Sequence, residues 1–128
     1  MSNPITDVSN AQLYRCQVYR YFSGLSRLYL SVFKFQQNVP AFYLLFSDVA
    51  YFEGPVSWES ADFYEGGPED CIDLLLNTGI VGPAILEFPK AYAPITETVR
   101  LYLVNTPHSQ IKIIAGSVAR LETVPADL

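Results

Sequence analysis

Several segments of the chain alternate apolar and polar residues with the two-residue period of β-strands. In residues 12–22, Tyr14, Cys16 and Val18 alternate with polar neighbours, although a helix over the same segment stays open as an alternative. The strand is favoured because the segment is rich in tyrosine and runs into the turn-like sequence SGLS. Residues 27–35 then predict the return strand of a hairpin, and the following QNVP predicts a turn.

The middle of the chain predicts a strand, a corner and a loop. The apolar run 41–46 is typical of a central strand. Asp48 separates this run from a shorter strand at 49–52, so it predicts a bulge or a tight corner. A loop-like segment follows, bracketed by Pro55 and the glycines at 66 and 67, and it contains the only tryptophan, Trp58.

One helix is predicted at residues 68–77. Pro68 fits the first helical position, where its missing N–H has no intrahelical partner. The carboxylates of Glu69 and Asp70 are favourable in the first helical turn. An apolar stripe follows, and Gly79 favours the left-handed conformation in which many helices end.

The last third of the chain returns to strand patterns. We expect a strand at 84–88 and a C-terminal hairpin made of strands 98–106 and 110–122. The sequence Pro107-His108-Ser109 predicts the turn of this hairpin.

These elements predict one α+β domain over residues 1–128. A chain of this length buries a hydrophobic core without disulfides or metals. We expect loose tails at 1–10 and 123–128. The fold should be mainly antiparallel β-sheet, arranged as a curled sheet, a small barrel or a sandwich, with the helix at about 68–77.

The charges are unevenly distributed along the chain. It has 13 acids, 8 basic residues and a net charge of −5. No Lys or Arg lies between Lys34 and Lys90, although nine of the acids do. Because this middle segment would repel nucleic acid, we expect no nucleic-acid partner. A basic protein would instead be attracted to it.

The sequence also predicts a location for the protein. No apolar run reaches the length of a membrane span, and the first residues lack the basic and apolar parts of a signal peptide. We therefore expect a cytoplasmic protein that does not associate with membranes. The only two cysteines, Cys16 and Cys71, lie in apolar contexts and are expected to be buried free thiols, with a disulfide as the alternative.

Most catalytic templates are missing from the sequence. The single histidine, His108, lies in the predicted turn and is expected to be structural. There is no glycine-rich phosphate loop, no nucleophile elbow and no pattern of zinc or calcium ligands. We therefore expect no metal, no cofactor and no catalytic residue. A hydrolase that uses paired carboxylates of the loop around Trp58 is a weaker alternative.

The stretch FSDVAYFEGPVSWESADFYEGG provides the candidate binding site. It holds five Phe or Tyr rings, the tryptophan and five acids, without a basic residue. The tryptophan is expected to be buried, with the acids as a solvated rim. As a binding face, the stretch would use Glu53, Trp58, Glu59, Asp62, Tyr64 and Glu65.

Three functional hypotheses follow from these observations. The first is a non-enzymatic binding protein that uses this acidic face against a basic protein. The second is a carrier of small molecules with an aromatic-lined cavity. The third is the carboxylate-dependent hydrolase. A homodimer also stays open, because exposed strand edges favour association between sheets.

Overall fold

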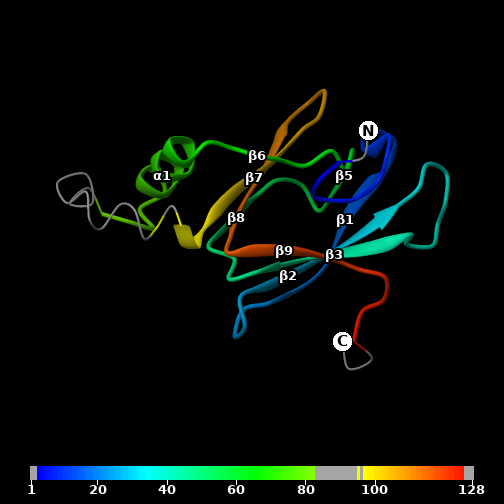
Figure 1. Ribbon diagram of the computed structural model, residues 1–128, viewed down its shortest axis with the longest axis horizontal. Helices are drawn as coiled ribbons and strands as arrows, with labels where there is room; N and C mark the ends of the chain where they lie inside the picture. The colour runs from blue at the N-terminus through cyan, green and yellow to red at the C-terminus, as the bar shows by residue number, and fades with distance from the viewer. Residues whose placement is uncertain (1–2, 83–94, 96, 126–128) are drawn as a thin grey trace.

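The computed structural model of the chain describes residues 3–82, 95 and 97–125. Two antiparallel β-sheets pack against each other, and a helix lies on the outer side of the smaller sheet (Figure 1). The five-stranded sheet has the order β5-β1-β2-β3-β9, and the four-stranded sheet has the order β4-β8-β7-β6. The elements are η1 (Ala11–Leu13), β1 (Arg15–Phe22), β2 (Arg27–Phe33), β3 (Phe42–Ser47), β4 (Tyr51–Glu53), β5 (Ser57–Glu59), β6 (Tyr64–Glu65), α1 (Pro68–Asn77), β7 (Arg100–Asn105), β8 (Gln110–Ala115) and β9 (Ser117–Leu121).

This arrangement confirms the predicted α+β class with mainly antiparallel sheet and a helix at 68–77. Of the three arrangements that the sequence left open, the chain forms the sandwich, and the described strands do not close into a barrel. The predicted strand at 84–88 lies outside the described residues.

The inner faces of both sheets form one hydrophobic core. Leu30 and Phe46 of the five-stranded sheet and Ile113 of the four-stranded sheet are fully buried in it. The ring of Phe46 lies 5.6 Å from that of Phe63 and 5.4 Å from that of Tyr102. Phe46 therefore connects the two sheets, and the removal of such side chains from water is the main contribution to folding.

Both predicted hairpins are present. β1 pairs with β2, so residues 15–22 form a strand and the helical alternative for 12–22 is wrong. β7 pairs with β8, and the chain turns at residues 106–109 as predicted. In the first hairpin the register shifts between Val18 and Arg20, which is a bulge.

One antiparallel ladder passes from the five-stranded sheet into the four-stranded sheet. It consists of β3 with β9 in the first sheet and β4 with β8 in the second. Between these pairs, the Gly116 N–H donates to the Ser47 carbonyl and the Ala50 N–H donates to the Ile114 carbonyl, each over 2.8 Å. The pairing therefore continues through the corner, and the two sheets share one bent pair of strands.

Asp48 and Gly116 form the corner of this ladder. Asp48 has a φ of 54°, in the left-handed region, which confirms the predicted bulge or corner. A Cβ atom at Gly116 would lie 3.1 Å from the side chain of Asp48, so the absence of a side chain allows the close approach. The predicted strand 110–122 is wrong as a single element, because the chain changes sheets at Gly116 and forms β8 and β9.

The segment predicted as a loop after Pro55 contains two short strands. β5 pairs with β1 and β6 pairs with β7, so each extends the edge of a different sheet. Three residues and two residues, respectively, are too few to show an alternating pattern. The prediction of a loop is therefore wrong for these five residues, because their backbone pairs with β1 and β7 although their side chains show no strand pattern.

α1 has the predicted bounds and ends as predicted. The Gly79 N–H donates to the Leu76 carbonyl and the Ile80 N–H to the Leu75 carbonyl, with Gly79 at a φ of 77°. These two bonds form a Schellman motif. The buried side chains of α1, Cys71, Ile72 and Leu75, pack on the outer face of the four-stranded sheet.

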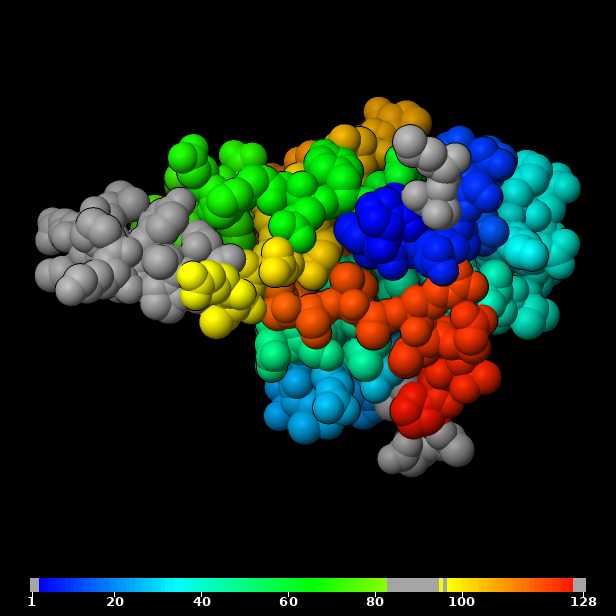
Figure 2. Space-filling view, viewed as in Figure 1, coloured from blue at the N-terminus to red at the C-terminus, as the bar shows by residue number. Residues whose placement is uncertain are grey.

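The N-terminal segment contacts the rest of the domain through residues 3–8. The side-chain oxygen of Asn3 accepts the N–H groups of Ile5 and Thr6, and Thr6 is completely buried. The Arg120 guanidinium of β9 donates to the carbonyls of Thr6 and Asp7, over 3.0 and 3.2 Å. Figure 2 shows this segment, in blue, beside β9 and the chain that follows it. Residues 3–8 therefore pack against the domain, while the expectation of loose tails over 1–10 and 123–128 stays a prediction.

Candidate binding site

The six residues of the predicted binding face lie in four different places. Glu53 lies on β4, and Tyr64 and Glu65 lie on β6, at opposite edges of the four-stranded sheet. Glu59 lies on β5, at an edge of the other sheet. The structure does not bring these carboxylates together into one face.

Asp62 lies apart from the others, and Trp58 precedes Glu59 on β5 but points into the core. Asp62 accepts a hydrogen bond from Asn3 Nδ2 over 2.6 Å and belongs to the N-terminal contact. Trp58 is buried, as predicted, with its ring 6.3 Å from Phe52 and 6.5 Å from Phe63. Its indole N–H has no hydrogen-bond partner among the described residues. Trp58 is therefore part of the core, where such an unpaired donor costs on the order of 1–3 kcal/mol.

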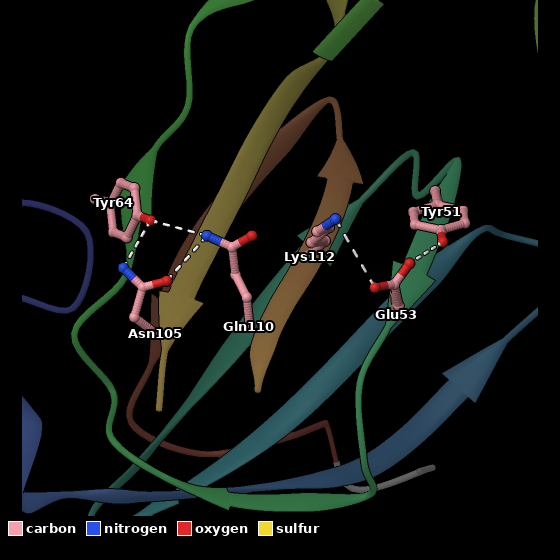
Figure 3. Close-up of polar contacts among 6 residues, drawn as sticks. All are labelled: Tyr51, Glu53, Tyr64, Asn105, Gln110 and Lys112. Atoms are coloured by element: carbon pink, nitrogen blue, oxygen red, sulfur yellow. Dashed lines mark hydrogen bonds and ion pairs between the residues drawn. The ribbon is translucent and has the colours of Figure 1, made fainter. Parts of the chain in front are cut away.

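A polar network crosses the outer face of the four-stranded sheet beside α1 (Figure 3). The Tyr64 hydroxyl accepts hydrogen bonds from Asn105 Nδ2 over 2.9 Å and from Gln110 Nε2 over 3.2 Å. Gln110 Nε2 also donates to Asn105 Oδ1 over 2.9 Å. Both amide hydrogens of Gln110 are then in use, which leaves its carbonyl oxygen and the Tyr64 O–H available for a ligand.

An ion pair occupies the other side of the same face. Lys112 Nζ lies 3.9 Å from Glu53 Oε2, and the Tyr51 hydroxyl donates to the other oxygen of Glu53. The hydrogen bond to Glu53 is the main reason why the pKa of Tyr51 is raised, with burial as the second cause. Glu53 is thus held by two partners, Lys112 and Tyr51, and is the predicted acid least available to bind another molecule.

A groove of about 540 Å³ runs between α1 and this polar face. We call it the acidic groove, and the polar residues that line it include Tyr64, Glu65, Asp70, Asp73, Gln110 and Lys112. Asp70 and Asp73 are exposed and lie three residues apart on α1, so their side chains project from neighbouring positions of one helix face. Of the predicted binding residues, Tyr64 and Glu65 line this groove.

A second groove of about 370 Å³ is almost entirely apolar. It lies where β1 and β2 meet the corner of the bent ladder, and it is lined by Val18, Tyr21, Leu28, Val49, Ala50, Tyr51, Phe52 and Val56. The groove is open to solvent, and its lining includes the aromatic rings of Tyr21, Tyr51 and Phe52.

The described residues offer little for metal or nucleophilic chemistry. No group of three His, Cys, Asp or Glu among them is placed to hold a metal ion. His108 is exposed in the turn between β7 and β8. No helix in the described part of the chain is long and apolar enough to cross a membrane.

Both cysteines are buried free thiols, as predicted, and burial raises the pKa of each. Because the thiolate is the reactive form, we expect Cys16 to resist a disulfide reagent at pH 8 in the native protein and to react after denaturation. Its folded-state pKa is raised, so its contribution to stability is complete below the ordinary thiol pKa of about 8.5 and is lost at higher pH. Thermal melts of wild type and Cys16→Ala above pH 8.5 would measure this loss of stability. A thiol that reacts equally fast in the native and the denatured protein would contradict the expected protection of Cys16.

Sequence reasoning missed most of the polar residues that build the acidic groove. Asn105, Gln110 and Lys112 were interpreted only as polar positions of a hairpin, and Asp70 only as a favourable charge in the first turn of a helix. The available signal was the position of Gln110 and Lys112, two residues apart and therefore on one face of a strand. Comparisons of the chain with protein-family models, with curated proteins and with solved structures found no match.

Proposed function

We propose that the protein is a non-enzymatic binding protein whose acidic groove receives a basic segment of a protein partner. The observation that supports this most is the state of its carboxylates. Among the described residues, Asp70 and Asp73 form no ion pair. Two unpaired carboxylates beside a groove attract cationic groups more strongly than scattered surface acids do.

The third carboxylate of the groove is only weakly engaged. Glu65 lies 3.3 Å from Arg100, and both side chains are about half exposed, at 48% and 49%. Such exposed ion pairs contribute little to stability because water screens them. A basic side chain of a partner could therefore compete with Arg100 for Glu65.

The polar network beside the acids provides contacts of another kind. The Tyr64 O–H is a donor and the Gln110 carbonyl oxygen is an acceptor, which are the two functions that pair with a peptide backbone. A basic peptide would thus place its cations near α1 and its backbone near β6 and β8. This combination favours a protein segment over a simple cation.

The test measures binding of a fluorescent tetra-arginine peptide by anisotropy, with a tetra-glutamate peptide as the probe of opposite charge. We expect only the arginine peptide to bind, and binding to weaken as salt rises. Asp70→Asn/Asp73→Asn should lower the affinity on the order of tenfold, since each exposed charge contributes roughly 0.2–1 kcal/mol.

A matched control separates the groove from the overall charge of the protein. The double variant Asp7→Asn/Glu59→Gln removes the same charge from exposed positions outside the groove and should bind like wild type. Equal losses of peptide affinity in the two double variants would show that the peptide is attracted only by the net charge of the protein, and would contradict the proposal.

The apolar groove supports the carrier of small apolar molecules as a second candidate function. Its volume lies in the range of pockets that bind small ligands. Phe52 lines the groove and lies 6.3 Å from Trp58, so the fluorescence of the only tryptophan would report an occupant. Titration with medium-chain alkanes and alcohols tests whether the groove binds such molecules. Trp58 fluorescence that stays unchanged up to the solubility limit of these compounds would exclude the carrier function.

A further inference from the structure

The outer face of the five-stranded sheet carries arginines above aromatic rings. We call it the arginine face, formed by Arg15, Arg20, Arg27, Phe22, Tyr29 and Phe33. Cross-strand pairing places these residues on one side, because Arg15 pairs with Phe33, Arg20 with Tyr29 and Phe22 with Arg27. Core residues such as Cys16 and Leu30 occupy the alternate positions, facing the other sheet.

Two of the three guanidinium groups of this face, those of Arg15 and Arg20, lie on aromatic rings. The Arg15 Cζ atom is 4.1 Å from the centre of the Phe33 ring, and the Arg20 Cζ atom is 5.6 Å from that of Phe22. Phe33 and Tyr29 are buried although they face away from the core, which is consistent with cover by neighbouring long side chains. Stacking orients a guanidinium while most of its N–H groups can still bind a carboxylate, and for Arg15 one of them donates to Gln17 Oε1 over 3.3 Å.

None of these arginines has an ion pair within the described structure. Arg100, Lys112 and Arg120 each have a carboxylate partner, and all three lie elsewhere. Glu59 is the register partner of Arg15 across the β1–β5 pair, yet the two form no ion pair. The arginine face therefore keeps an uncompensated positive charge.

The arginine face and the acidic groove lie on opposite sides of the molecule. The order of layers is the five-stranded sheet, the four-stranded sheet and then α1, so the two surfaces cannot meet within one chain (Figure 1). Within the part of the chain that the structure describes, one surface holds three arginines without an ion pair and the other holds Asp70 and Asp73 without one. Charge complementarity between them makes a second copy of this chain a suitable partner for each.

We propose that the protein associates with itself head to tail, with the arginine face of one copy in the acidic groove of the next. This inference rests on the proposed function and names a second copy as the basic partner. The contact joins two different surfaces, so it is heterologous, and it leaves one groove and one arginine face free at the ends of an open assembly. The mean size should therefore increase with protein concentration.

The experiment is sedimentation velocity over a range of concentrations, in low salt and in about 0.5 M NaCl, where surface charges are strongly screened. Asp70→Lys/Asp73→Lys gives both surfaces a positive charge, and Arg20→Glu/Arg27→Glu gives both a negative charge. We expect wild type to associate at low salt and each variant alone to associate at least tenfold more weakly. An equal mixture of the two variants should associate again, because each then meets an opposite charge.

The mixture is also the control for folding, since a misfolded variant could not restore association. A wild type that stays monomeric at every concentration, or a mixture that stays monomeric, would overturn the proposal. Single-stranded DNA that binds the arginine face of a monomeric protein would overturn it as well. Binding of tetra-arginine by a monomeric wild type would leave the proposed function standing while this inference failed.

Discussion

Replacement of Phe46 by alanine should lower the free energy of unfolding by about 3–5 kcal/mol, the usual range for a buried phenylalanine. The side chain is fully buried, and its ring packs against Tyr102 of β7 in the other sheet and against Phe63 in the connection between β5 and β6. The cavity would lie between the two sheets, where neither sheet can close it without a shift of the other. Urea denaturation followed by the fluorescence of Trp58 measures the change.

The control for this prediction is Phe35→Ala. Phe35 is 70% exposed, so its removal should change the free energy of unfolding by less than about 0.5 kcal/mol. Because a domain of this size has a total stability of about 5–15 kcal/mol, the Phe46 variant should melt far earlier than wild type. A loss below about 1 kcal/mol would show that Phe46 is not a central contact of the sandwich.

The second large effect is expected for Ile72→Ala in α1. Ile72 is 2% exposed and packs with Leu101 and Leu103 on the outer face of β7, so its truncation should cost about 2–5 kcal/mol. The substitution should also weaken binding of the basic peptide, because α1 carries Asp70 and Asp73. A helix that packs poorly no longer holds these carboxylates beside Tyr64, and affinity for the tetra-arginine peptide should fall.

Two measurements together decide this prediction. Urea denaturation gives the free energy of unfolding. The affinity for the tetra-arginine peptide, measured by anisotropy at urea concentrations below the unfolding transition, shows whether the groove is intact. Glu69→Ala, an exposed position in the same helix, should cost less than about 1 kcal/mol and should leave the groove in place. Unchanged peptide affinity in a clearly destabilised Ile72 variant would show that the groove does not depend on the packing of α1.

The sequence predicts those parts of the fold that depend on local patterns. Pro68, the apolar stripe after it and Gly79 determine where α1 begins and ends, and the structure confirms these bounds. The short strands β5 and β6 were missed because their hydrogen bonds join segments distant in the chain, such as β6 with β7. The turn at Gly116 was missed because strand-forming residues lie on both sides of it and no proline or cluster of turn residues marks the corner.

The candidate site was less predictable than the fold. Closeness along the chain suggested one acidic face, but the two sheets separate Glu59 from Glu65 although only five residues lie between them. The groove instead combines residues from α1, β6 and β8, which meet only through the pairing order of the four-stranded sheet. A linear pattern cannot show this order, since antiparallel strands of the same composition can pair in many ways.

The bent ladder affects how the chain can fold. Its strands 42–53 and 112–121 are separated by residues 54–111, which are 58 of the 128 residues and include α1. The pairing of β1 with β2 and of β2 with β3 can form early because these contacts are local. The other edge of β3 and the strand β4 find their partners only in β9 and β8. Closing this long loop costs conformational entropy before any pairing offsets it. On a ribosome, the five-stranded sheet would therefore stay incomplete until β9 has been made, and the part of the chain before α1 would not be expected to complete it alone.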